Sequence, residues 1–336
     1  MIPLSEAQHR AATSGEMPQP ESIRDGLWSV PMPMPGARLA YNLAAVCIAP
    51  SGAVSVVDPG WEAPGSADLL DAFLQTRGAR IEDVQNIIVT HAHPDHIGSA
   101  ESLRQRSGAQ VVMHRREQQS IDVGATGTLG LSERMREWGV AESMTSVLVE
   151  RMHAAELAGG ALAHADLLVD DGDLLPVEGL EWRVLHTPGH TPGHICLVDA
   201  EHELILTGDH VLPMVFPGVG LGADLGTNAP DDYLRSLRRL APFDDFEVVP
   251  GHGYRFRGLR ERRSDAAAHA LQRAQEVEKV LREDPGASTW DVASRLTWKG
   301  GWARVSSGWM LYSGLVQTSM YREFVASDGI ARHTHA

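Results

Sequence analysis

Short apolar runs rich in Val and Ile, each bounded by Gly or Pro, recur between residues 43 and 250 and are typical of β-strands. Segments with apolar residues at helical spacing separate some of these runs, so the pattern predicts a mixed α/β body. The turn Pro50-Ser51-Gly52 joins two runs as a hairpin does, so the sheet is not wholly parallel. The predicted strands are Leu43–Ala49, Ala53–Asp58, Val84–Thr90, Ala109–His114, Leu180–His186, Ile195–Asp199, Glu203–Thr207 and Glu247–Pro250, and the predicted helices are Ser66–Arg77, Asp95–Gly108 and Pro230–Leu240.

The pattern changes at three places, and these changes divide the chain. Residues 1–25 are polar and contain three prolines, which indicates a loose N-terminal leader. Residues 115–165 carry a mostly helical pattern, and we interpret them as an insertion that forms scaffold, a lid or a pocket wall. After Gly253 the strand signals stop, and Arg262–Glu283 has the spacing of a long helix. The expected organisation is a leader (1–25), a main domain (26–258) that includes the helical insertion (115–165), and a small C-terminal helical domain (259–336).

Composition narrows the class of protein. The chain has 336 residues, 43% hydrophobic and 22% charged, which suits a globular protein with a substantial core. Cys47 and Cys196 are its two cysteines, so neither a disulfide framework nor a cysteine zinc cluster is available. Sixteen histidines are unusual, because histidine is scarce in most proteins and is a common metal ligand. No apolar run is long enough to span a bilayer and the N-terminus has no secretory pattern, so we expect a cytoplasmic protein that does not associate with membranes.

The charge is unevenly distributed along the chain. Lys plus Arg number 29 and Asp plus Glu 44, which gives a net charge of −15, yet basic residues exceed acidic ones by four from Arg255 onward. The acidic body repels nucleic acid at long range, and the tail offers at most a modest basic patch. We therefore expect a small-molecule substrate rather than a nucleic acid, and packing of the tail on the acidic body explains its charge more simply.

The strongest chemical signal is the segment His91-Ala92-His93-Pro94-Asp95-His96, which directly follows the apolar run VQNIIV. Three imidazoles and one carboxylate within six residues at a strand end offer the nitrogen and oxygen donors that zinc prefers. The pattern HxHxDH arises by chance in roughly one sequence in 400 of this composition. A polar loop that holds these histidines by coincidence is therefore a weak alternative.

Three further candidates follow later strand-like runs. They are His190 in the repeated motif TPGHTPGH, Asp209 at the end of LILTGD, and His252 in VPGHG. Loops at strand ends hold ligands rigidly and leave a metal open to substrate. Gly and Pro beside each candidate allow the sharp turns that bring these side chains inward. Each motif alone is more typical of a turn, but the four segments together predict one metal site.

The segments HAHPDH, TPGHTPGHICLV, LTGDHVLP and VPGHG, in this order and spacing, resemble the metallo-β-lactamase superfamily. They are most similar to its glyoxalase II-like branch, and specifically to the β-lactamase-like hydrolases with a winged-helix C-terminal tail. The resemblance is strong over about residues 25–255 and looser in the tail. It implies an αββα sandwich, in which two mixed β-sheets are flanked by helices and a two-metal site lies along one edge. A small helical or winged-helix-like domain would follow.

The resemblance also implies which residues bind the metals. His91, His93 and His190 would bind one ion, Asp95, His96 and His252 the other, and Asp209 would bridge the two. It leaves His194, the second histidine of TPGHTPGH, outside the ligand set. All seven positions carry residue types that can bind a metal, which argues against a non-catalytic member of the family. The cofactors implied are two divalent metal ions, with zinc favoured and iron or manganese as alternatives.

The chemistry of this ligand set suits hydrolysis. Five neutral histidines and two carboxylates leave two divalent ions with about two excess positive charges, enough to hold a bridging hydroxide, because zinc lowers the pKa of bound water to roughly 7. Asp95 is the candidate catalytic residue, because it could also orient this nucleophile. Asp58 is expected to orient the ligand loop from outside, with a capped turn as an equal alternative. His210 and Tyr254 are weaker candidates, the first for such a supporting role and the second for contact with a substrate carbonyl.

The leading hypothesis is a dinuclear metal-dependent hydrolase that uses the bridging hydroxide to cleave an ester, thioester or lactone. One alternative is an RNA nuclease or phosphodiesterase, because relatives with winged tails include RNA-cleaving members. Loss of RNA cleavage on mutation of Arg262 or Arg263 would favour it. Another alternative is an oxidoreductase similar to the mononuclear-iron persulfide dioxygenases. Two bound metals with His96 and His252 retained would exclude that activity.

The tail contains four tryptophans, which we expect to form its core or its contact with the body or a partner subunit: Trp290, Trp298, Trp302 and Trp309. Stacking on a substrate is the less favoured role. A homodimer formed through the tail is a further expectation from the resemblance.

Overall fold

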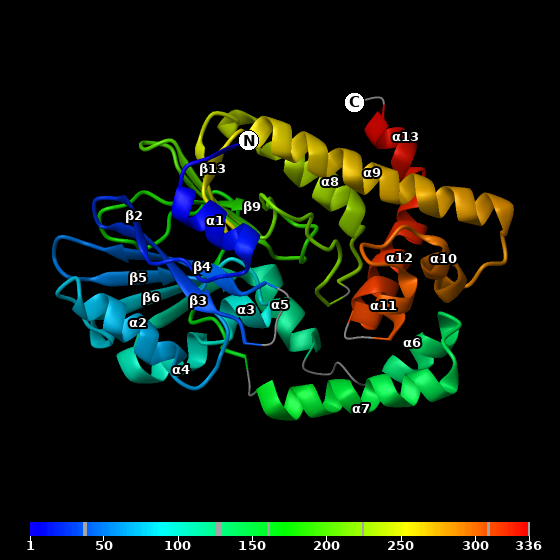
Figure 1. Cartoon of the computed structure of the whole chain (residues 1–336), viewed down its shortest axis with the longest axis horizontal. Helices are drawn as coiled ribbons and strands as arrows, with labels where there is room; N and C mark the ends of the chain where they lie inside the picture. Colours follow the sequence, from blue (N-terminus) through cyan, green and yellow to red (C-terminus); the bar gives the residue numbers. More distant parts are fainter. Residues whose placement is uncertain (36–38, 125–129, 160–161, 224, 308–309, 335–336) are drawn as a thin grey trace.

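The protein folds as two β-sheets packed face to face, with helices on both outer faces (Figure 1). This computed structural model describes residues 1–35, 39–124, 130–159, 162–223, 225–307 and 310–334. Among these residues, the larger sheet has seven strands, in the order β2 (Glu21–Arg24), β3 (Leu27–Pro33), β4 (Tyr41–Ile48), β5 (Val54–Val57), β6 (Val84–Val89), β7 (Gln110–His114) and β8 (Leu167–Val169). The smaller sheet has six, in the order β1 (Ile2–Pro3), β13 (Phe256–Arg257), β12 (Glu247–Pro250), β11 (Leu204–Gly208), β10 (Ile195–Asp199) and β9 (Arg183–His186).

Both sheets are mixed, as the sequence predicts. In the larger sheet β4 and β5 pair antiparallel, while β5 and β6 pair parallel. In the smaller sheet β10 and β11 pair antiparallel, while β11 and β12 pair parallel. The eight predicted strands correspond to β4–β7 and β9–β12, and their ends differ by a few residues. The αββα sandwich is therefore confirmed.

The second half of strand β6 shows why these runs are apolar where both faces of the sheet are covered. Ile88 packs between the two sheets with Trp182, which is fully buried. Its neighbours Ile87 and Val89 belong to the core on the outer face of the larger sheet. Successive residues of a strand point to opposite faces, so a strand covered on both faces carries no polar side.

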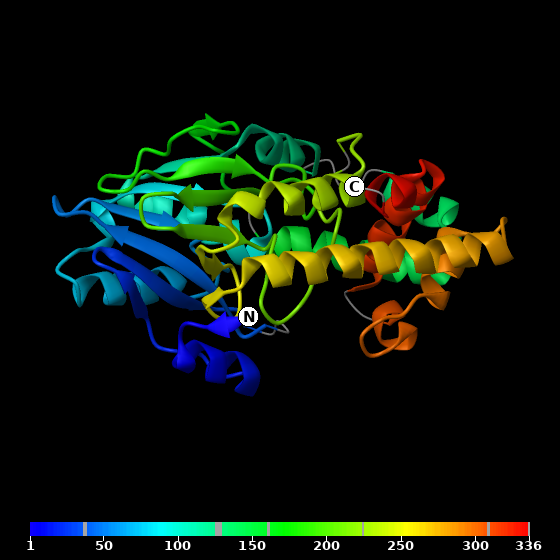
Figure 2. The ribbon, with the colours of Figure 1, turned by 90° about the horizontal axis from the view of Figure 1, so that it is seen from above.

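Helices cover the outer faces of the sandwich. α2 (Ser66–Gln75) and α4 (Ala100–Ser107) pack on the larger sheet through Leu70, Leu74 and Leu103. α8 (Ala229–Arg239) and α9 (Leu259–Glu283) pack on the smaller sheet through a separate core. Two short 3-10 helices, η1 (Ile81–Asp83) and η2 (Ala241–Phe243), lead into β6 and β12. In Figure 2, α9 extends from the sandwich beyond its edge toward the C-terminal helices.

The helix predicted over Asp95–Gly108 is divided in two. α3 (Pro94–Ile97) is a single turn, and α4 begins after Ser99. The reason is the segment around Gly60, whose N–H donates to the carbonyl of His96 and whose carbonyl accepts from the N–H of Ser99. Gly98 makes room for this segment, because a side chain there would collide with the backbone of Glu62. The break therefore fixes His96 at a helix end.

The prediction of a loose leader at residues 1–25 is wrong. These residues contain β1, the helix α1 (Glu6–Ser14) and β2. Gln8 is fully buried, and its side chain donates to Ser29 and accepts from the N–H of Arg255. The helix was missed because it buries only Gln8 and Ala11 and shows no apolar stripe. Its capping residues Ser5 and Gly15 were the usable signal.

The insertion and the tail are both helical, as predicted. The insertion contains α5 (Arg115–Gly124), α6 (Leu131–Glu137) and α7 (Glu142–Gly159), and the tail continues from α9 with α10 (Thr289–Arg295), α11 (Trp302–Ser306), α12 (Met310–Ala326) and α13 (Gly329–Thr334). Leu131 and Met135 of the insertion share one apolar core with Ala293 and Leu315 of the tail. Figure 1 shows α6 and α7 beside the tail helices. The insertion thus supports the tail.

The winged-helix form of the tail is not supported. From residue 259 to residue 334, outside 308–309, the described chain forms helices and no strand, whereas a wing is a β-hairpin. α9 begins at Leu259, where the C-terminal domain is predicted to begin, although the division into domains stays a prediction. Trp290, Trp298 and Trp302 are partly buried and pack against the core shared with the insertion, and Trp309 lies outside the described residues. None of the described helices combines the length and apolar character that crossing a bilayer requires.

Replacing Leu197 by Ala tests the core between the sheets. Leu197 is fully buried there, so Leu197→Ala should lower the free energy of unfolding by about 2–5 kcal/mol in urea denaturation. The matched control is Leu69→Ala on α2, where the side chain is 49% exposed and the loss should stay below about 0.5 kcal/mol. Equal losses in the two variants would contradict the assigned packing.

Candidate metal centre

The seven predicted metal ligands come together at one edge of the sandwich, each from a segment that follows a strand. His91, His93, Asp95 and His96 follow β6, His190 lies between β9 and β10, Asp209 follows β11 and His252 follows β12. The carboxyl ends of β11 and β12 meet at this edge because the two strands are parallel. The side chains form two groups of three, with Asp209 between them.

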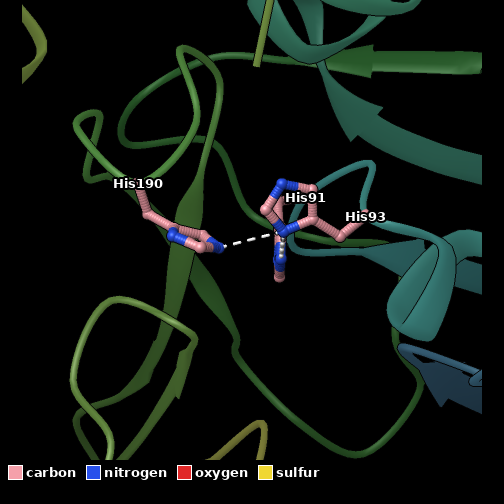
Figure 3. Close-up of side chains that lie close together, drawn as sticks. All are labelled: His91, His93 and His190. Atoms are coloured by element: carbon pink, nitrogen blue, oxygen red, sulfur yellow. Dashed lines mark hydrogen bonds between the residues drawn. The ribbon is translucent and has the colours of Figure 1, made fainter. Parts of the chain in front are cut away.

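The first group consists of three histidines. His91 Nε2 lies 3.0 Å from His93 Nδ1, and His190 Nε2 lies 3.1 Å from the same atom. Figure 3 shows the three rings turned toward one another from two different loops. Three imidazole nitrogens that converge in this way form one face of a tetrahedral nitrogen site.

The second group consists of Asp95, His96 and His252. His252 Nε2 lies 3.2 Å from Asp95 Oδ2 and 3.2 Å from His96 Nε2. His96 Nε2 lies 4.0 Å from the same carboxylate oxygen. This group therefore offers two nitrogens and one oxygen from two loops.

Asp209 lies between the groups and presents one oxygen to each. Oδ1 lies 3.4 Å from His96 Nε2 and 3.5 Å from His252 Nε2, while Oδ2 lies 3.8 Å from His190 Nε2. Oδ1 is buried and has no hydrogen-bond partner among the described residues. A buried carboxylate oxygen without a partner is costly unless a cation satisfies it.

Each histidine of the groups has its other nitrogen engaged outside the cluster. Nε2 of His93 donates to the carbonyl of Leu221 at 2.9 Å, Nδ1 of His190 to that of Gly218 at 2.7 Å, and Nδ1 of His252 to that of Tyr41 at 2.9 Å. A carbonyl can only accept, so the proton must be on the outer nitrogen. When the ring is neutral, the inner nitrogen then presents its lone pair to the cluster.

Asp58 and Thr90 fix the remaining two rings in the same way. Asp58 Oδ2 accepts from His96 Nδ1 at 2.8 Å and from the Thr90 hydroxyl at 2.6 Å, while Oδ1 accepts from the Thr90 N–H. Thr90 uses its proton for Asp58, so its oxygen accepts from His91 Nδ1 at 3.1 Å. Both oxygens of Asp58 are thus engaged in orienting the ligand loop. A left-handed backbone at Asp58, with φ of 52°, turns this carboxylate inward.

The electrostatic environment differs between the groups. Burial, and then the neighbouring imidazoles, lower the pKa of His91 far below its ordinary value and that of His190 to about 4, so these rings are neutral at neutral pH. Burial also acts to lower the pKa of His96 and His252, but nearby carboxylates outweigh it and raise both pKa values. They are Asp209, Asp58 and Asp95 for His96, and Asp209 and Asp95 for His252. A divalent cation would replace the protons held there.

The donor set fits divalent metal ions. Five imidazole nitrogens with outward protons and two carboxylates converge, and an unpaired carboxylate oxygen lies at their centre. Nitrogen and oxygen donors of this kind suit zinc, and they also suit iron and manganese. His91, His93, Asp95, His96, His190, Asp209 and His252 are the residues that would hold the ions.

The two weaker candidates differ in their surroundings. His210 is fully buried, and neither ring nitrogen has a hydrogen-bond partner among the described residues. Its ring lies 5.6 Å from that of His194, and burial lowers its pKa to about 3. Tyr254 packs against His9 of α1 and against Phe256, rather than against the metal ligands. Contact of Tyr254 with a substrate stays a prediction.

Two supporting residues were not singled out by the sequence as such. Glu117 is buried on α5 and accepts from the N–H of Ala92, the hydroxyl of Thr191 and the N–H of Gly193, so it ties two ligand loops together. No sequence motif indicates this role of Glu117. His194, which the resemblance leaves outside the ligand set, accepts from the N–H of Asp209 through Nε2 while Nδ1 contacts Thr187. Its place in TPGHTPGH was the available signal.

Comparisons with known proteins identify the family of this chain. The metallo-β-lactamase superfamily model matches residues 44–252, so the chain belongs to that superfamily and is a metallo-hydrolase. The hydroxyacylglutathione hydrolase GloC of Haemophilus influenzae is 27% identical over 212 residues, which cover 59% of this chain and 79% of the relative. The β-lactamase-like protein 2 homolog of Caenorhabditis elegans is 22% identical over 280 residues, which cover 83% and 77%.

Solved structures share the fold beyond the sandwich. The metallo-β-lactamase family protein TTHA1429 from Thermus thermophilus aligns with a TM-score of 0.77 at 25% identity and covers 92% of this chain and 95% of its own. A β-lactamase domain protein from Burkholderia ambifaria aligns with a TM-score of 0.70 at 23% identity and covers 91% and 89%. The helical tail and the insertion therefore belong to an architecture shared with these two proteins.

Glu117→Gln tests the support of the ligand loops. A glutamine amide can accept through its oxygen alone, so at least one of the three donors would lose its partner. We expect the affinity for divalent metal, measured by competition with a chelator, to fall about 10–100-fold. Glu133→Gln, at an exposed carboxylate on α6, is the control and should leave the affinity unchanged. Unchanged affinity in Glu117→Gln would show that the loops hold without this residue.

Proposed function

We propose that this protein hydrolyses an ester, thioester or lactone with two divalent metal ions. The observation that carries the proposal is the position of Asp209, with one oxygen toward each of two groups of ligand atoms. A single ion would leave one of these groups without a function. Relatives named hydroxyacylglutathione hydrolase support an acyl-transfer reaction to water, because that name describes a thioester.

When bound, the two ions would supply Lewis acidity and lower the pKa of a water molecule to roughly 7. The residues of the chain itself hold the ligand atoms in place. Asp209 holds the two groups of ligands in register, and the outer hydrogen bonds keep all five imidazoles in the binding tautomer. Asp95 keeps 18% of its side chain exposed, against 11% for Asp209, and is the carboxylate that an incoming water molecule can reach more easily. It would orient that water and hold its proton.

Charge favours a carbonyl substrate over RNA. Arg262 is buried, and its guanidinium donates to the carbonyls of Leu212 and Val215. Arg263 makes a two-pronged ion pair with Asp244. These arginines therefore serve the fold, and the acidic body would repel a polyanion. Mutation of Arg262 would disturb a loop beside the site whatever the substrate, so it is a poor test of RNA binding.

The second group of ligands argues against a mononuclear oxidoreductase. This group has all three of its predicted ligands, Asp95, His96 and His252. The Nε2 atoms of the two histidines lie within 3.5 Å of Asp209 Oδ1. A site for one ion has no need of this second set. The metal content of the protein decides between the two activities.

Metal content is the first test. We expect close to two divalent ions per chain by elemental analysis of the purified protein, and close to one in His190→Ala and in His252→Ala, because each variant removes a ligand from one group. His164→Ala is the matched control, since that side chain is 63% exposed and outside both groups. One ion in the unmodified protein would overturn the dinuclear proposal.

Activity is the second test. A panel of thioesters, esters, lactones, β-lactams, phosphodiesters and RNA should show the highest kcat/KM for one of the first three classes. Removal of metal by a chelator should abolish this activity, and added zinc, iron or manganese should restore it. Asp95→Asn should lower kcat about 10²–10⁴-fold, because an amide cannot take up the proton of water. Faster cleavage of RNA than of any carbonyl substrate would contradict the proposal.

A further inference from the structure

A cavity of about 520 Å³ lies outside the metal cluster, between the loop 214–219, α9 and the tail helices. This volume is within the usual range for small-molecule sites. It is separate from the ligand groups, because none of the seven metal ligands lines it. Its walls come from the body, through residues 214–219 and Tyr233, and from the tail, through α9 and residues between 297 and 321, so the cavity exists only because the tail packs back on the body.

The charged groups that line this cavity are positive. Arg273 and Lys299 are part of the wall together with His269, and no Asp or Glu lines the cavity within the described residues. This is unusual for a chain with a net charge of −15 and two lysines. Glu276 and the carbonyl of Thr297 already engage Arg273. Lys299 is exposed and has no ion pair or hydrogen bond to any described residue.

Flat apolar surfaces complete the wall. Phe216 is stacked on His269 with ring centroids 4.3 Å apart, and the guanidinium of Arg262 lies 4.1 Å from its ring centre. The ring is thus held in place while 36% of the residue stays exposed. In the tail part of the wall, the guanidinium of Arg273 lies over the ring of Trp298, 4.6 Å from its centre. Rigid aromatic rings beside a free cation suit an anion with a flat or apolar body.

The loop that lines the cavity also supports the metal ligands. The carbonyl of Gly218, in the cavity wall, accepts from His190, and that of Leu221 accepts from His93. Met214 and Val215 line both this cavity and a smaller one of about 80 Å³ that includes His252. The smaller cavity has no charged lysine, arginine or carboxylate in its described lining. One loop therefore separates an uncharged space beside a metal ligand from a larger, cationic space.

We propose that the larger cavity binds the non-reacting part of the substrate, and that this part is an organic anion with an aromatic or otherwise apolar body. Lys299 would contact the anionic group, and Phe216 and Trp298 would contact the apolar body. The reacting carbonyl would lie on the metal side of Met214 and Val215. This inference rests on the proposed hydrolase function for the identity of the occupant, but binding itself can be measured without turnover.

The test uses the full-length, metal-loaded protein and two probes that are poor metal ligands. 2-Naphthalenesulfonate carries the charge, and methyl 2-naphthyl sulfone has the same ring without it. Calorimetry should show that the sulfonate binds about tenfold more tightly than the sulfone. Lys299→Gln should abolish this difference, whereas Lys299→Arg should keep most of it. The control is Lys279→Gln. Lys279, the other lysine of the chain, is exposed on α9 outside the cavity, so this variant should behave like the unmodified protein.

Turnover provides an independent arm. For a thioester series with one acyl group, a leaving thiol that carries an arylsulfonate should have a KM about tenfold lower than its neutral counterpart, and Lys299→Gln should remove that advantage without changing metal content. Sulfonate binding that survives in Lys299→Gln, or that falls equally in Lys279→Gln, would overturn the proposal. Intact sulfonate binding with no hydrolysis of any carbonyl substrate would instead overturn the proposed function and leave the anion site standing.

Discussion

Each of the five imidazoles in the metal cluster has one nitrogen tied to an acceptor outside it, and this constraint organises the site. The outer partners are the carbonyls of Tyr41, Gly218 and Leu221, the carboxylate of Asp58 and the hydroxyl of Thr90. In a neutral imidazole a proton on the outer nitrogen leaves the lone pair on the inner one, so these contacts select the tautomer that can bind a metal. The converging lone pairs and carboxylates make a cation the natural occupant.

Because the acceptors come from distant segments, the metal-binding side chains are oriented only when most of the chain is folded. The acceptor for His252 is 211 residues away in sequence, and those for His190 and His93 are on a loop that also touches the tail. The short motif after β6 supplies four of the seven ligands, but none of them is oriented by that motif alone. The sandwich edge, where β6, β11 and β12 end, is what brings the loops together.

The sequence predicted eight of the thirteen strands in the described residues and the seven residues that the fold brings together, because these leave local patterns, whereas β1, β2, β3, β8 and β13 were not predicted. β6 reads as a strand since both of its faces are buried, and HAHPDH concentrates ligands within six residues. Supporting contacts leave no such pattern. Glu117 is one of many carboxylates until α5 packs it against two loops, and backbone carbonyls are chemically identical everywhere. The helix α1 was missed for a related reason, since its burial depends on Gln8, a polar residue.

The packing of the insertion on the tail couples two segments that the sequence presents as separate. Leu131 and Met135 lose their cover if the tail is replaced, and Ala293 and Leu315 lose theirs if the insertion is shortened. A change in one segment is therefore tolerated only with a complementary change in the other. Chimeras between this chain and its structural neighbours would have to exchange both segments as a pair to keep this shared core covered.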